Sequence, residues 1–123
     1  MIVNFQNNFI NFNGRQYFKQ MFDRCAYTGK VFTRNNPRSV EHIVPHSFEG
    51  SLNHVSNYLI VAKSINSQRG NMPLDEFLRQ HPSFEKNIVE TVKSKHGIVV
   101  EGIVWADEVR KTLAKVLGRD IFT

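Results

Sequence analysis

The stretch from Ser39 to Gly70 constrains the fold of this chain more than any other. An apolar, β-branched run ends at Pro45, a polar loop rich in Ser, Asn and Gly follows, and a second apolar run leads into a segment that stops at Gly70. Proline cannot donate to a strand ladder, and glycine suits the position after a helix. The pattern predicts four pieces in order: a strand over 39–44, a loop over 46–56, an extended or helix-entering run over 57–61, and a helix over 62–69.

The same stretch concentrates side chains that can hold a metal or move a proton. They are Glu41, His42, His46, His54, Asn57 and Asn66. A carboxylate is a hard oxygen ligand, and a neutral imidazole accepts protons with an ordinary pKa of about 6.5. Phosphodiester hydrolysis needs both, because water must lose a proton and the charge on the phosphate must be neutralised. Taken alone, an adjacent Glu-His pair is more often an ordinary exposed pair, since strand neighbours point to opposite faces.

The spacing of two asparagines favours the functional interpretation. Asn57 lies 15 residues after His42, and Asn66 lies nine residues after Asn57. Asn66 falls in the predicted helix, where its amide oxygen could complete a metal site with Glu41. Asn57 falls where the loop rejoins packed structure, and its side chain can satisfy backbone groups that the loop leaves unpaired.

At these residues the sequence resembles the HNH nuclease family. The segment EHIVP at 41–45 is similar to the family's acidic-His strand, NYL at 57–59 to its middle-Asn segment, and NSQRGN at 66–71 to its terminal helix. Three further segments are especially similar to the HNH domains of CRISPR effector nucleases: CAYTGK at 25–30, PHSF at 45–48 and GNMPLDEF at 70–77. The resemblance covers residues 15–78 of a single expected domain, 1–123, and leaves 79–123 as a C-terminal helical extension.

The resemblance implies an α+β fold with a ββα-metal core, in which a two-stranded antiparallel hairpin and a helix surround one divalent cation and additional helices surround the core. It implies that His42 is the general base, that Glu41 and Asn66 bind the metal, and that Asn57 steadies the loop. Oxygen ligands favour Mg²⁺ or Mn²⁺ over Zn²⁺. The implied activity is DNA hydrolysis that nicks one strand per site.

Two departures from the family pattern affect the metal chemistry. Many members carry Asp where this chain has Glu41, so the carboxylate here reaches one methylene further. Many also hold a structural zinc with two Cys-x-x-Cys pairs, but Cys25 is the only cysteine of this chain. No structural zinc is therefore expected, and Cys25 is expected to be buried. Packing is expected to hold the hairpin to the helix instead, through Tyr27, Leu59, Ile60, Val61 and Ile65.

Net charge indicates a polyanionic partner. The chain carries a formal charge of +5 and a pI of about 9.6, which suit nucleic acid and, by the resemblance, double-stranded DNA. The candidate DNA-contacting residues are Arg69, Lys63, Arg38, Arg34 and Lys30. Arg69 stands one turn from Asn66 and is as consistent with a phosphate contact as with ordinary surface charge, whereas each of the other four, taken individually, is more consistent with ordinary surface charge.

The sequence also bears on cellular location, on oligomeric partners and on alternatives to DNA cleavage. The sequence has neither an apolar run of membrane-spanning length nor a signal peptide, so an intracellular protein is expected. A homodimer or a larger nuclease complex is possible. The alternatives to a DNA nuclease are a catalytically silent nucleic-acid-binding module, and the same fold acting on RNA or DNA junctions.

The remaining elements follow from periodicity and turn signals. Alternating Phe and Asn over 1–14 predicts a short strand or hairpin arm. The expected helices are 15–24, one beginning at 72–78, 84–95 and 105–117, and the expected further β-prone pieces are 31–33 and, as strand or connector, 98–104.

Overall fold

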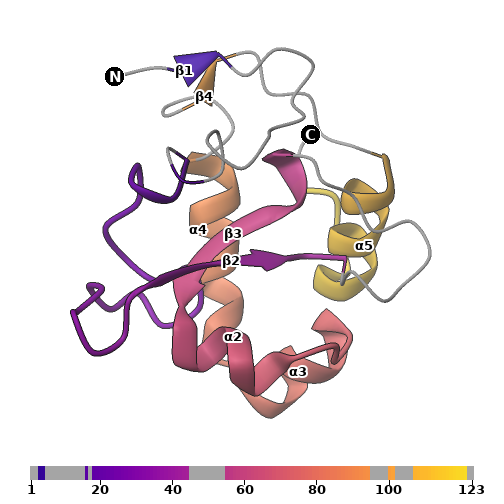
Figure 1. The fold of residues 1–123 in the computed structure, drawn as a ribbon. Helices are drawn as coiled ribbons and strands as arrows, with labels where there is room; N and C mark the ends of the chain where they lie inside the picture. The colour runs from indigo at the N-terminus through magenta and orange to yellow at the C-terminus, as the bar shows by residue number, and fades with distance from the viewer. Residues whose placement is uncertain are drawn as a thin grey trace.

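The computed structural model describes residues 3–4, 16, 18–44, 55–94, 100–101 and 107–121 of the 123-residue chain. In these residues the fold is α+β, with a two-stranded antiparallel hairpin and four α-helices (Figure 1). The helices are α2 (Lys63–Arg69), α3 (Leu74–Gln80), α4 (Phe84–Ser94) and α5 (Asp107–Leu117).

The hairpin joins β2 (Arg38–His42) to β3 (Tyr58–Ala62), and α2 follows β3 without a break. The register pairs Arg38 with Ala62 at one end and His42 with Tyr58 at the other. A short 3-10 turn, η2 (Val55–Asn57), leads into β3. The predicted order of strand, extended run and helix is confirmed, with the first strand ending at His42 rather than at residue 44.

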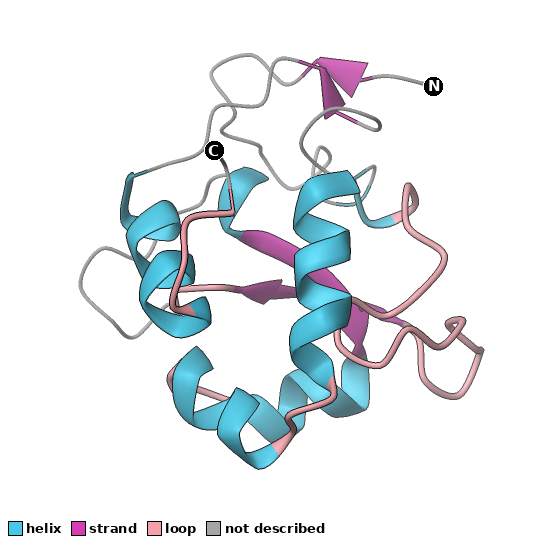
Figure 2. Cartoon of the chain, turned by 180° about the vertical axis from the view of Figure 1, so that it is seen from behind, coloured by secondary structure: helices cyan, strands magenta, loops and turns pink. Residues whose placement is uncertain are grey.

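One hydrophobic core serves the hairpin and the C-terminal helices together. The residues of β3 are all buried, and the same cluster contains Ile88 and Val92 of α4 with Val109 and Leu113 of α5. Helix α4 lies behind the hairpin in Figure 1 and in front of it in Figure 2, so it covers one face. The helices beyond residue 78 therefore complete the core around the hairpin.

Several sequence expectations need correction outside this core. The helix expected over 15–24 is shorter, because the helical residues are 16, 18 and 19 and the chain turns at 20–21. Phe18 and Phe22 pack edge to face across this turn, with ring centroids 5.1 Å apart. Residues 31–33 form two isolated bridges rather than a strand. Pro73 stands just before α3, at its N-cap.

Two short strands lie apart from the hairpin. β1 (Val3–Asn4) pairs in parallel with β4 (Val100–Glu101), which agrees in part with the pieces expected at 1–14 and 98–104. His46, His54 and Trp105 lie outside the described residues, as does the loop expected over 46–56 up to residue 54. Within the described ranges, no helix has the length and apolar character that crossing a membrane requires.

Candidate active site

Glu41 and His42 point to opposite faces of β2. The strand keeps its regular antiparallel register through His42, so neighbouring side chains alternate as in any pleated strand. Glu41 is buried with 2% of its surface exposed, whereas His42 is half-buried and packs edge to face on Tyr58 at 5.1 Å. The Glu41 face looks into the core, and the His42 face looks toward the ring of Tyr58.

Arg69, at the end of α2, clamps the strand end that carries both residues. It is 2% exposed, and its Nη1 lies 3.5 Å from Glu41 Oε1. Its guanidinium also donates four hydrogen bonds at 2.8–3.2 Å, to the carbonyl oxygens of His42, Ile43 and Met72 and to the hydroxyl of Tyr27. The expected contact between Arg69 and a nucleic-acid phosphate does not agree with this position, because the guanidinium is buried and engaged.

The hydroxyl of Tyr27 contacts Arg69 and Glu41, whereas the sequence predicts Tyr27 only as a packing residue. Its hydroxyl accepts from Arg69 and interacts with Glu41, so the three side chains form one buried cluster. Burial, reinforced by the charge of Glu41, raises the pKa of Tyr27 well above its usual value. The residue therefore stays a neutral hydroxyl. A buried tyrosine needs a partner for its hydroxyl, and that requirement was the available sequence signal.

Burial dominates the electrostatics of Glu41. It raises the pKa of the carboxyl from 4.5 to about 7, although the charge of Arg69 and the hydroxyl of Tyr27 both act to lower it. One oxygen, Oε2, is buried and has no hydrogen-bond partner in the part of the chain that the structure describes. A carboxylate in this state gains strongly from any cation or donor that reaches Oε2.

Asn66 lies against the outer edge of β2. Its Nδ2 donates to Ser39 Oγ at 2.6 Å and to the Val40 carbonyl at 3.0 Å. Asn66 and Arg69 are three residues apart on α2, and the carbonyls that they meet, on Val40 and His42, are two residues apart on β2. The helix therefore satisfies alternate carbonyls of an edge strand that would otherwise need another strand or water.

Asn57 holds the backbone just beyond β2. Its Oδ1 accepts from the Val44 amide at 2.8 Å, and its Nδ2 donates to the Val44 carbonyl at 3.2 Å. Its own carbonyl accepts from the Ile43 amide at 2.9 Å. The side chain is fully buried, so it fixes the path of the chain as it leaves His42.

The donor set suits a hard divalent cation in its chemistry. Glu41 offers the buried oxygen Oε2, and Asn66 offers Oδ1, since both of its described hydrogen bonds use Nδ2. The two residues are on adjoining elements, because Asn66 bonds the carbonyl of the residue before Glu41. No cluster of three or more His, Cys, Asp or Glu side chains forms among the described residues, so a site here would depend on the amide oxygen.

The other candidate DNA-contacting residues differ in how much charge they present. Lys30, Arg34 and Lys63 are exposed. Arg38 is partly buried: its Nε donates to the Phe22 carbonyl at 2.7 Å, and its Nη2 lies 3.5 Å from Asp23. Arg38 is therefore partly neutralised, while the other three are open to solvent.

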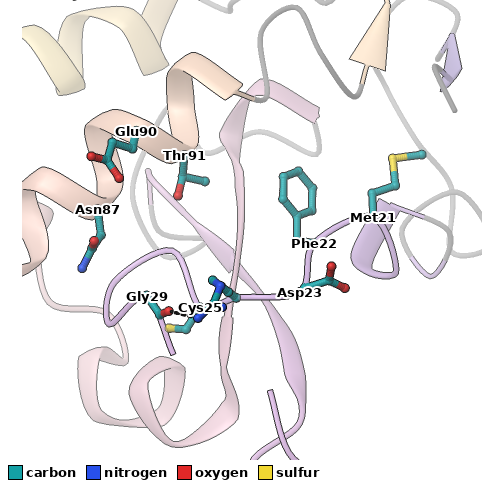
Figure 3. A pocket seen from close by; sticks show the side chains of 9 residues that line it. Met21, Phe22, Asp23, Cys25, Gly29, Asn87, Glu90 and Thr91 are labelled. Carbon is teal, nitrogen blue, oxygen red and sulfur yellow. Dashed lines mark hydrogen bonds between the residues drawn. The ribbon is translucent and has the colours of Figure 1, made fainter. Parts of the chain in front are cut away.

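Cys25 lies on a different part of the molecule from Glu41 and His42. It is buried, as expected, and its Sγ accepts from the Ala62 amide at 3.3 Å. It borders a cavity of about 350 Å³ between the 21–29 segment and α4. Asn87 and Glu90 line this cavity from the α4 side (Figure 3). None of the predicted catalytic residues lines this cavity.

Comparisons with models of protein families, with curated proteins and with solved structures found no match to this chain.

Proposed function

We propose that this protein is a small metal-dependent DNA endonuclease of the HNH type, with a ββα-metal core made of β2, β3 and α2. The observation that carries the proposal is the arrangement of four side chains around one strand end. Glu41 and His42 end β2, Asn57 fixes the backbone that follows, and Asn66 reaches β2 from the helix. Their order and spacing are those for which the sequence resembles the family.

The chemistry assigns a different task to each face of β2. On the core face, Glu41 and Asn66 would hold Mg²⁺ or Mn²⁺ through oxygen atoms. A cation bound there supplies neutralisation of the negative charge that builds up on the phosphate and the leaving oxygen. On the other face, the imidazole of His42 would accept a proton from water. The resulting hydroxide bonds to phosphorus as the bond from phosphorus to the 3′ oxygen breaks. Because Glu41 and His42 point to opposite faces, both groups can serve one phosphate only across the end of β2, where His42 is the last residue of the strand.

The position of His42 sets one requirement on this mechanism. Its Nε2 is buried in this structure, so water must reach Nδ1 or gain access to Nε2 before the ring can act as a base. The clamp on its carbonyl and the Tyr58 ring restrict how the imidazole can move. We therefore assign His42 a fixed backbone and a ring held against Tyr58, so that water must come to the ring.

A second candidate function follows from the burial of Glu41. A carboxylate that is 2% exposed and ion-paired to a buried arginine can be a purely structural charge. In that case the protein is a catalytically silent nucleic-acid-binding module. The same geometry is compatible with cleavage of RNA or DNA junctions in place of duplex DNA.

Cleavage of supercoiled plasmid across a panel of divalent metals distinguishes these functions. The nuclease is expected to produce nicked circles with Mg²⁺ or Mn²⁺ and none with EDTA. His42→Ala should lower the rate roughly 10²–10⁴-fold, the usual contribution of a general base, and Asn66→Ala should remove the metal-dependent nicking. Binding of plasmid without nicking under any metal would support the silent module, and nicking in EDTA would contradict the proposed mechanism.

A further inference from the structure

A groove of about 560 Å³ runs beside the first half of β2. Three parts of the chain line it: the helical segment with Gln16 and Lys19, the backbone and side chains of 37–40, and Lys63 at the start of α2. The lining contains three cationic side chains, those of Lys19, Arg38 and Lys63, and no carboxylate. Its charge therefore suits an anionic ligand.

Two lysines carry the available charge of this groove. Lys63 is exposed and Lys19 is half-buried, and neither forms an ion pair within the described residues. Arg38 contributes less, because it stacks on the Phe32 ring at 5.1 Å and pairs with Asp23. Lys19 is not among the DNA-contacting residues that the sequence predicts, since it falls within the helix expected over 15–24.

Part of the groove lies on the face of β2 that carries His42, because Arg38 and Val40 line it together with Ser39 of the opposite face. Val40, which lines the groove, is two residues from His42, and alternate residues of a strand share a face. An independent chain of ring contacts agrees: His42 packs on Tyr58, and Tyr58 lies 6.4 Å from Phe18, the neighbour of Lys19. The segment that supplies one wall of the groove therefore sits on the His42 side.

We propose that this groove holds the sugar-phosphate backbone of the strand that carries the scissile phosphate, with Lys19 and Lys63 neutralising phosphates on one side of it. The inference rests on the proposed nuclease function. Ala62, next to Lys63, pairs with Arg38, four residues before His42. That separation is about 13 Å along a strand, and one strand of a duplex rises about 3.4 Å per phosphate. Lys63 thus meets a phosphate a few nucleotides from the cleaved bond.

Salt dependence of binding tests the groove without any cleavage. Binding of a DNA duplex is measured in EDTA over a series of NaCl concentrations, for the full chain and for Lys19→Gln, Lys63→Gln and the double variant. Each lost phosphate contact lowers the slope of log K against log salt by about 0.9 on duplex DNA, so the double variant should lose about 1.8. Lys86→Gln, at an exposed residue of α4 far in sequence from the groove, is the matched control and should keep the slope.

Kinetics of plasmid nicking then separate this inference from the proposed function. The double variant should raise KM with kcat unchanged, whereas His42→Ala should lower kcat. A double variant with the wild-type slope overturns the groove, whatever the nicking assay gives. A slope reduced by the expected amount, in a protein that nicks with no metal, supports the groove as a backbone-binding surface and overturns the catalytic assignment alone.

Discussion

The two faces of β2 are built differently, although their central residues are neighbours in the sequence. On the core face, Glu41 is buried in a cluster with Arg69 and Tyr27, where every change of charge has a large energetic cost. On the other face, His42 touches the ring of Tyr58, and Val40 of the same face lines a cationic groove. The difference indicates that the core face sets the position of the strand end, while the other face carries the partly exposed His42.

This contrast explains why α2 carries polar residues toward the strand. Asn66 and Arg69 replace the ladder partner that the edge of β2 lacks, and they do so from a helix of seven residues. An edge strand completed by side chains keeps its register without adding another strand. The predictions that follow compare the two faces, beginning with the largest expected effect.

Arg69→Ala should destabilise the protein by about 3–5 kcal/mol, the usual cost of breaking a buried ion pair. The variant leaves Glu41 buried without its cation and leaves the carbonyls of His42 and Ile43 without their donors. Urea unfolding measures the change. Arg34→Ala, at an exposed arginine, is the control and should change stability by no more than about 0.5 kcal/mol.

Equal stability losses for the two arginine variants would show that the clamp on β2 is not formed. Arg69→Lys tests the geometry more finely. A lysine retains the charge but cannot reach four acceptors in one plane, so it should recover only part of the lost stability. Recovery to the wild-type value would show that charge alone matters at this position.

The stability of the metal-free protein should fall as pH rises through the range in which Glu41 titrates. The folded state raises the pKa of this carboxyl from 4.5 to about 7, so it binds the proton more tightly than the unfolded chain does. The protonated carboxyl makes its full contribution to the free energy of unfolding below pH 4.5, and this contribution is lost as the pH rises through about 7. The loss amounts to about 3 kcal/mol.

Unfolding in EDTA at several pH values, for the wild type and for Glu41→Gln, measures this contribution. The difference between the two proteins should change by that amount across the window, because glutamine does not titrate. Added Mg²⁺ at pH 8 should stabilise the wild type and leave the variant unchanged. A pH-independent difference between the two proteins would contradict the burial of a titrating carboxyl.

Asn57→Ala should cost about 1–3 kcal/mol, because it removes two hydrogen bonds, to the amide and to the carbonyl of Val44, in a buried position. Asn36→Ala is a matched control on the surface, where Asn36 bonds Ser64 and water can replace it. Its cost should be smaller, about 0.5–1 kcal/mol. Similar costs for both asparagines would remove the special role of Asn57 in the backbone after β2.

The sequence predicted the order of elements around the site better than the contacts within it. Pro45, the polar loop and Gly70 bounded the strand and the helix closely, because turn residues act locally. The destination of Arg69 was not predictable, since a basic residue one turn from Asn66 could face solvent or strand. Its burial depends on carbonyls of His42 and Ile43, some 26 residues away, and on the edge of β2 lacking another strand.

The smallest expected effect on stability belongs to His42. His42→Ala removes an edge-to-face contact with Tyr58, and such aromatic pairs contribute about 0.5–1.5 kcal/mol. The carbonyl of His42, which Arg69 clamps, is unaffected by the substitution because it belongs to the backbone. The variant should therefore lose about 1 kcal/mol in urea unfolding.

Because this expected loss of stability is small, His42→Ala can separate the role of each face of β2 in folding from its role in nicking. If the core face fixes the strand and the other face acts on substrate, His42→Ala should leave the fold and the affinity for DNA intact while removing nicking. Glu41→Gln should alter both stability and nicking, because its carboxyl belongs to the buried cluster and to the donor set. A His42→Ala protein that loses several kcal/mol, as Arg69→Ala should, would show that both faces serve the fold and would favour the silent module over the nuclease.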